Sequence, residues 1–250
     1  MQRARDKLRR ENIEIEMPDA SQIESRLDNV LATIYLVFNE GYYSLSQDKT
    51  LRRELCFEAM RLCNMLVENE YTSQPSVNAL LSLMCFHASR FNARLDRNGE
   101  IVLYEEQDES LWNPELINKG GYFLKQAASG SRLSKYHLEA AIAYWSTQKT
   151  DTREKWESVL HLYDQLLEIA WSPTAALNRL YAVSKVLGNQ TAITEAEKLN
   201  PSDDPFYFSL LGELYLQNDN EKARLNFKKA YALTRTETGR QLLQRKIDKC

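Results

Sequence analysis

The side chains that most often do chemistry in enzymes are few in this sequence and widely spaced. Its three histidines, His87, His137 and His161, are 50 and 24 residues apart and fall in unrelated helical segments. No His-x3-His or Cys-x2-Cys pair occurs, and these are the spacings typical of zinc sites. A phosphate-binding glycine loop and a nucleophile elbow are absent as well. The sequence therefore predicts a protein that is not an enzyme and that holds no metal and no cofactor.

The densest group of polar side chains lies in residues 91–112. There, Asn98-Gly99 separates two short extended runs, and this pair favours the positive φ angles of a tight hairpin turn. We therefore expect a small two-stranded β-ribbon at about residues 93–104. The acidic run that follows, at 105–109, must be solvated or satisfied by specific partners, because an ionised group that is buried and unpaired costs several kcal/mol.

Composition and charge are those of an ordinary globular chain. Of its 250 residues, 43% are hydrophobic and 27% are charged, and the net charge of −3 does not suggest a nucleic-acid-binding surface. No run of about 18 apolar residues occurs, and the basic start is followed by no apolar stretch that could be a signal peptide. The spacing of the four cysteines matches neither a zinc site nor a disulfide framework. We expect reduced structural thiols, a cytoplasmic location and no membrane contact.

Apolar residues recur at helical spacing through most of the chain, which predicts an all-α fold. The first helix is expected to begin near Ser21 and to end at Asn39-Glu40-Gly41, because glycine readily takes the left-handed conformation that closes helices. Three further helices are expected to begin at capping or proline signals near residues 48–50, 75 and 114.

After Gly130 the chain is predicted to form helical hairpins. The pairs span residues 136–147 with 154–170, 173–187 with 190–199, and 205–217 with 221–233. The first helices of the pairs begin 37 and 32 residues apart, close to the period of tetratricopeptide-type repeats. The third pair fits that pattern best, because Gly212 and Ala223 allow close approach while Tyr215 and Phe227 fill the groove. A final basic helix at 237–249 would cap the stack.

These elements divide the chain into three parts. Residues 1–18 form a basic tail and connector, residues 19–130 a helical domain that carries the ribbon, and residues 131–250 the tetratricopeptide-like repeats with their capping helix. The expected fold class is all-α: a helical domain with a small β-ribbon insert, followed by tetratricopeptide-like helical hairpin repeats.

Several blocks of sequence carry a resemblance to a known family. The first block is Tyr35-Leu-Val-Phe-Asn-Glu-Gly-Tyr42, and the second is the helix with Leu55, Glu58, Ala59 and Arg61-Leu62. The third contains Ala93-Arg-Leu-Asp96, Gly99, Glu106-Gln-Asp108 and Leu111-Trp112. The later blocks are Leu138-Glu-Ala-Ala-Ile-Ala143, Leu162-Tyr-Asp164 and Ser172-Pro173 with Leu177-Asn-Arg179. In this order they resemble the C-terminal extension of a group of extracytoplasmic-function (ECF) RNA polymerase sigma factors. The resemblance covers about residues 1–235. The family's sigma region 2 and nearly all of its region 4 are absent, and residues 3–10 resemble only the tail of the region 4 recognition helix.

The resemblance implies a non-catalytic regulatory domain that controls an ECF-type sigma factor through protein contact. Its partners would be sigma factor domains or RNA polymerase, with no direct DNA binding by this fragment and no membrane. The partner-binding residues would be Arg94, Asp96, Glu106, Gln107, Asp108 and Trp112. From the residues alone, Arg94 and Asp96 could equally pair with neighbours to hold the ribbon on the helices.

Two other functions fit the sequence. One is a general scaffold whose concave repeat surface binds a peptide or partner protein through Asn178, Arg179 and Tyr181. The other is a small-ligand sensor or a hydrolase that uses Glu106, Asp108 and a histidine. An exposed groove lined by the first set would favour the scaffold, and a closed pocket joining the second set would favour the sensor.

Overall fold

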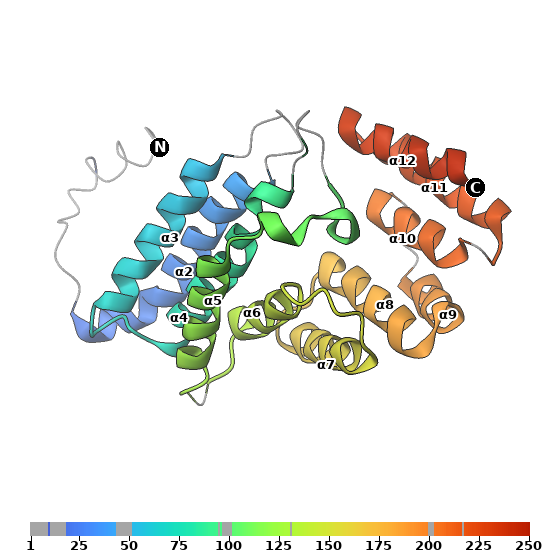
Figure 1. The fold of residues 1–250 in the computed structure, drawn as a ribbon. Coiled ribbons are helices and arrows are strands. Elements are labelled where there is room, and N and C mark those ends of the chain that lie inside the picture. The colour runs from blue at the N-terminus through green and yellow to red at the C-terminus, as the bar shows by residue number, and fades with distance from the viewer. Residues whose placement is uncertain are drawn as a thin grey trace.

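The protein is built from helices that follow one another closely along the chain. The structure, a computed structural model, describes residues 10, 19–43, 52–94, 96, 102–130, 132–199, 203–216 and 218–250. In these residues eleven α-helices and three 3-10 helices occur and no strand, so the all-α prediction is confirmed. Helices next in sequence pack together like successive hairpins, in a row that bends away from an N-terminal bundle (Figure 1). None of the described helices combines the length and apolar character needed to cross a membrane.

Four helices form the N-terminal bundle: α2 (Ala20–Tyr43), α3 (Arg53–Glu68), α4 (Pro75–Ser89) and α5 (Pro114–Ala127). The central helix is α4, which packs against each of the other three. Twelve of its 15 residues are buried, so α4 is enclosed on all sides. Burial raises the pKa of the Cys63 and Cys85 thiols to about 12, and both therefore stay protonated at neutral pH.

The end of α2 differs from the prediction. The helix does not end at Gly41 but continues to Tyr43. Gly41 is buried, and a Cβ atom there would lie 2.7 Å from both the Arg52 carbonyl oxygen and the Cys56 Sγ. The missing side chain therefore allows the start of α3 to pack closely against α2, and it does not terminate the helix.

Seven helices make up the rest of the chain: α6 (Lys135–Trp145), α7 (Arg153–Ile169), α8 (Pro173–Leu187), α9 (Asn189–Leu199), α10 (Pro205–Tyr215), α11 (Asn220–Leu233) and α12 (Glu237–Lys249). Their ends agree with the predicted ends within two residues. Local capping explains this agreement, because the side chains of Thr152, Ser172 and Asp219 accept hydrogen bonds from backbone N–H groups in the first turns of α7, α8 and α11.

The apolar core of the bundle continues onto α6. Tyr136, Ala140 and Ala143 of α6 lie in the same buried cluster as Leu80 and Phe86 of α4. Because α6 also packs against α7, it belongs to both the bundle and the row of hairpins. The packing therefore runs on past residue 130, where the sequence suggests a domain boundary.

The hairpin of α10 and α11 shows the close approach that its small residues predict. A Cβ atom on Gly212 would lie 2.4 Å from the ring of Phe227, which is fully buried. Ala223 and Ala230 of α11 are buried beside Phe227. The two helices can reach this distance only because position 212 has no side chain.

The region of the predicted β-ribbon contains short 3-10 helices where it is described. η2 (Phe91–Ala93) comes first, and η3 (Tyr104–Glu106) and η4 (Glu109–Leu111) follow. The Val102 N–H donates a 2.9 Å hydrogen bond to the Arg94 carbonyl, and no strand forms in the described residues on either side. Residues 95 and 97–101 of the ribbon lie outside the described part of the chain, as do residues 1–9 and 11–18 of the basic tail.

Candidate functional site

The polar segment, which we define as residues 102–112, lies in space between the bundle and the hairpins. Its turns lie between the bundle and α8 (Figure 1). At its C-terminal end, the Asn113 N–H donates a 2.8 Å hydrogen bond to the carbonyl of Ser89, the last residue of α4. On the other side the segment meets the loop between α6 and α7 and the exposed face of α8. It therefore makes polar contacts with both halves of the chain.

Two buried side chains fix the polar segment in place. Gln107 is only 6% exposed, and its Nε2 donates to the Val102 carbonyl at 3.4 Å. Trp112 is 7% exposed and stacks on the ring of Tyr104, with ring centroids 6.3 Å apart. The Lys149 ammonium donates to the Gln107 carbonyl and lies 6.0 Å from the centroid of the Trp112 ring. These contacts give the segment a packed inner side.

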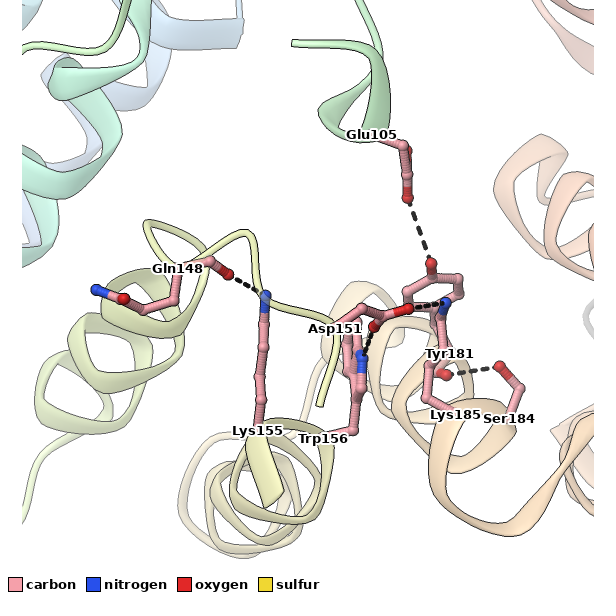
Figure 2. A network of polar contacts seen from close by, with 8 residues as sticks. All are labelled: Glu105, Gln148, Asp151, Lys155, Trp156, Tyr181, Ser184 and Lys185. Carbon is pink, nitrogen blue, oxygen red and sulfur yellow. Dashed lines mark hydrogen bonds and ion pairs between the residues drawn. The ribbon is translucent and has the colours of Figure 1, made fainter. Parts of the chain in front are cut away.

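A network of polar contacts continues from the segment to α7 and α8 (Figure 2). The Tyr181 hydroxyl donates to the Glu105 carboxylate at 3.3 Å. Asp151, in the loop before α7, accepts a hydrogen bond from the Trp156 indole and pairs with the Lys185 ammonium at 3.4 Å. The Asp151 carboxylate thus joins the first turn of α7 to the last turn of α8.

Aromatic rings lie beside the two lysine side chains of this network, Lys155 and Lys185. The Trp156 ring meets the Tyr181 ring edge to face, at 5.4 Å between centroids, and the Lys185 ammonium lies 5.5 Å from both rings. Lys155 is 4% exposed, donates to the Gln148 carbonyl and lies 5.8 Å from the Tyr104 ring. Each ammonium is therefore stabilised by a carbonyl or carboxylate oxygen together with aromatic faces.

The protonation states of these groups follow from their surroundings. The hydrogen bond from the Trp156 indole, helped by the charge of Lys185, lowers the pKa of Asp151. Burial raises the pKa of Tyr104, and burial together with the Glu105 charge raises that of Tyr181. Burial also lowers the pKa of Lys155, while Asp151 acts in the opposite direction. At neutral pH the network therefore combines an ionised Asp151 with two protonated phenols.

The six residues predicted to bind a partner do not form one surface. Gln107 and Trp112 point inward and pack, as described above. The guanidinium of Arg94 lies 3.8 Å from the centroid of the Tyr42 ring on α2. Asp96, Glu106 and Asp108 are exposed. Asp108 also caps η4, where its Oδ1 accepts from the Ser110 N–H at 2.9 Å, and the hydrogen bonds from Ser110 lower the pKa of this carboxyl.

The three residues predicted on the repeat surface also have different surroundings. The Arg179 guanidinium pairs with Asp164 of α7 at 2.6 Å and with Glu195 of α9 at 2.5 Å, so it links three successive helices. Tyr181 contacts the polar segment through Glu105, a contact that the sequence did not suggest. Asn178 is exposed on α8.

The sequence did not identify the side chains that contact the polar segment or belong to the network beside it. They are Lys149, Asp151, Lys155, Trp156 and Lys185. A signal for some of them was present, because Thr152 is a capping residue and the polar run before it marks a loop at the start of a helix. Nothing in the local pattern connects that loop to residues 102–112. In the part of the chain that the structure describes, no group of three or more His, Cys, Asp or Glu residues is placed to hold a metal ion.

A family model matches the bundle of this chain, and a longer relative aligns with nearly all of it. Residues 26–128 match a family model described as a family of unknown function (DUF6596). The chain is also 33% identical over 250 residues to the uncharacterized protein R00370 of Rhizobium meliloti (strain 1021), an alignment that covers 98% of this chain and 59% of the relative. The chain thus spans about 59% of the length of the curated relative that it matches. No solved structure matches it.

The two matches differ in how much of the site they include. The family match extends from α2 through the polar segment to the end of α5. Lys149, Asp151 and Tyr181 lie beyond it, in helices and loops that only the longer alignment includes. The candidate site therefore joins a part that matches the family model to a part that does not.

Proposed function

We propose that this chain is a non-catalytic regulatory domain that controls an ECF-type RNA polymerase sigma factor through protein contact. One observation carries the proposal: the polar segment has a buried inner side, formed by Gln107 and Trp112, and an outer side that presents acidic side chains. The resemblance to the C-terminal extension of these sigma factors runs through the same residues. A firmly anchored, charged segment is well suited to bind a partner, because little conformational entropy is lost when it docks.

The charge of the outer side indicates what kind of surface it would meet. The exposed residues Glu105, Glu106, Asp108 and Glu109 give the segment a concentrated negative charge. A DNA-binding helix-turn-helix, such as that of sigma region 4, has a basic surface. Complementary charges steer association and fix the orientation of the complex. We therefore place region 4 against the outer side of the polar segment.

The hairpins of α6 to α11 would then act as tetratricopeptide-like repeats that position the segment. Their sequential packing and the close approach at Gly212 support this assignment. The contacts of Tyr181 with Glu105 and of Lys149 with the Gln107 carbonyl tie the segment to these hairpins. A change in the packing of the hairpins would consequently move the acidic side chains.

The relative R00370 is longer than the aligned region and is therefore long enough to contain further domains. R00370 contains additional chain outside the aligned region. We propose that sigma regions 2 and 4 occupy that part in proteins of this kind. In such proteins the regulatory contact would form within one polypeptide.

The proposal is tested by calorimetric titration of this chain with isolated region 2 and region 4 segments of an ECF sigma factor from the same genome. The test variant is the double change Glu106→Gln and Glu109→Gln. The matched control is Glu154→Gln with Glu168→Gln, which removes the same charge from exposed positions on α7. We expect saturable binding of region 4, weakened at least tenfold by the test variant, unaffected by the control and reduced by added salt. Absence of binding at tens of micromolar, or equal effects of both variants, would contradict the proposal.

The alternatives receive less support from the geometry. A scaffold that binds through Arg179 and Tyr181 would have to compete with the contacts that both side chains already make inside the chain. A sensor or hydrolase built on Glu106 and Asp108 would need them to converge with a histidine, whereas both are exposed and His87 lines a cavity that includes neither of them.

A further inference from the structure

A second feature of the molecule takes no part in the proposed function. A cavity of about 710 Å³ lies where the bundle meets the hairpins, and residues of α2, α4, α6, α7, α8 and α10 line it. Cavities of this size are typical of small-molecule sites. Its wall is partly apolar, with Leu83, Ile142 and Phe206 among the lining residues. Six helices from both halves of the chain thus line one space, which is partly open to solvent.

Two buried polar atoms in the wall of this cavity have no hydrogen-bond partner. They are the Nδ1 of His87 on α4 and the Oε2 of Glu139 on α6. A buried polar atom without a partner costs about 1–3 kcal/mol. The side chains that carry these atoms line the cavity, although the atoms themselves have almost no accessible surface, so a bound molecule would supply their hydrogen bonds after a small rotation of each side chain.

His87 is held as a neutral imidazole. Its ring packs against Tyr42, with ring centroids 4.9 Å apart. Burial, together with the positive charges of Arg90 and Arg94, lowers the pKa of His87 to about 3. The ring is therefore uncharged at neutral pH, and its Nδ1 offers one hydrogen bond to a ligand without adding a positive charge.

The charge of the cavity wall is negative. Glu139 and Asp204 line it, and no lysine or arginine is among the described residues that do. Asp204 is partly engaged, because its carboxylate accepts from the Phe206 N–H at 2.8 Å. Burial raises the pKa of Glu139, while Lys135 and the Tyr35 hydroxyl act in the opposite direction. The Lys135 ammonium itself lies over the rings of Tyr35 and Tyr136, at 5.9 and 5.1 Å from their centroids.

Aromatic side chains complete the wall. Tyr35, Tyr163 and Phe206 come from three different helices and line the same space. Aromatic faces and a carboxylate are the groups that proteins use to bind organic ammonium ions. An anion would meet a negative wall, and an uncharged apolar molecule would leave the Oε2 of Glu139 and the Nδ1 of His87 without partners.

We propose that this cavity binds a small organic ammonium compound with an apolar or aromatic body. The ammonium group donates to the Oε2 of Glu139 and lies against the aromatic faces. A second polar group of the ligand forms the hydrogen bond with the Nδ1 of His87, and the apolar body fills the space beside Leu83, Ile142 and Phe206. This inference is independent of the proposed action on a sigma factor.

A neighbouring, smaller cavity lies between this one and the polar segment. This smaller cavity of about 230 Å³, lined by Tyr104 and Glu105, shares Ile142, Ser146, Tyr163 and Asn178 with the large one. A ligand in the large cavity therefore lies next to the helices that hold the segment in place. Its binding would stiffen the contact between the bundle and the hairpins.

The test compares three probes of similar size that differ in charge: the cation phenethylamine, the anion phenylacetate and the uncharged 2-phenylethanol. Binding to the full chain is measured by saturation-transfer NMR and by the shift of the melting temperature. We expect phenethylamine to bind saturably and to raise the melting temperature, and the acid and the alcohol to bind at least tenfold more weakly. This comparison needs no variant. Equal binding of the three probes, or no binding of the amine at 5 mM, which is on the order of the weakest affinity such a site would have, overturns the proposal.

Variants then locate the binding. Glu139→Gln keeps the size of the side chain and removes its charge, and it should weaken phenethylamine binding at least tenfold. Glu157→Gln, on the exposed face of α7, is the control and should leave binding unchanged. Amine binding that survives Glu139→Gln in a folded variant assigns the ligand to another place and contradicts the inference.

Discussion

Trp112 illustrates how one side chain can be interpreted in two ways. Its type and its position in a polar stretch suggest an apolar anchor for a partner protein. In the structure it is 7% exposed, stacks on Tyr104 and lies under the ammonium of Lys149. Its main role within this chain is therefore to pack, and the adjoining acidic residues are the ones that face outward.

Replacing Trp112 by alanine should destabilise the fold. Removal of a buried aromatic side chain costs about 3–5 kcal/mol. The neighbouring change Leu111→Ala is the control, because Leu111 is 46% exposed and should have a small effect. Urea denaturation followed by circular dichroism measures both free energies of unfolding. Equal stability of the Trp112→Ala variant and the unmodified chain would show that this packing contributes little.

His87 should make stability depend on pH. Its pKa is lowered from 6.5 to about 3 by burial and by Arg90 and Arg94, so the unfolded state binds more protons between these two values. The stabilisation is complete above pH 6.5 and is lost as the pH falls toward 3. The loss reaches about 1.4 kcal/mol per pH unit for this one group.

A His87→Gln variant tests this pH dependence. Its free energy of unfolding, measured by urea denaturation at intervals from pH 7 to about pH 4, should fall less steeply than that of the unmodified chain. Glu139 faces the same cavity, and it is present in both proteins, so its titration cancels in the comparison. Parallel curves would mean that His87 is not buried in its neutral form.

At the scale of the element, adjacent glycines in α5 have opposite roles. A Cβ atom on Gly120 would lie 2.6 Å from the Phe86 ring of α4, whereas one on Gly121 would meet nothing within 4 Å. Gly120→Ala should lower stability by about 1–3 kcal/mol through overpacking. Gly121→Ala should raise it by about 0.5–1 kcal/mol, because alanine favours the helix. Thermal unfolding of the two variants side by side measures this, and the same change in both would contradict the packing described for α4 and α5.

The helices could be predicted from the sequence because their signals are local. Ser172 followed by Pro173 marks the start of α8, and Asp219 marks that of α11. The end of α2 could not be predicted at Gly41, since the reason for that glycine is the closeness of Cys56 on the next helix.

The position of the polar segment could not be predicted either, because its partners are distant in sequence. Lys149 is 42 residues from Gln107, and Tyr181 is 76 residues from Glu105. No periodicity or motif encodes such pairs. The segment itself could be identified as a candidate site, because it is the densest polar stretch in a helical chain.

At the scale of the whole molecule, the bundle and the hairpins pack together at α6, and residues 102–112 add polar contacts between them. A smaller cavity, lined by Tyr104 and Glu105 of this segment, adjoins the cavity between the two halves. The proposed docking surface and the proposed ligand site therefore contact the same helices. A ligand that reduces motion between the bundle and the hairpins would also reduce motion of the acidic side chains of the polar segment.

Hydrogen exchange of the full chain, with and without saturating sigma region 4, tests the central claim most directly. If region 4 docks on the polar segment, amides of residues 102–112 should exchange more slowly in the complex, while those of α11 and α12 should not change. Protection should disappear when Glu106→Gln and Glu109→Gln are combined. Unchanged exchange at residues 102–112, or protection confined to the C-terminal helices, would contradict the account.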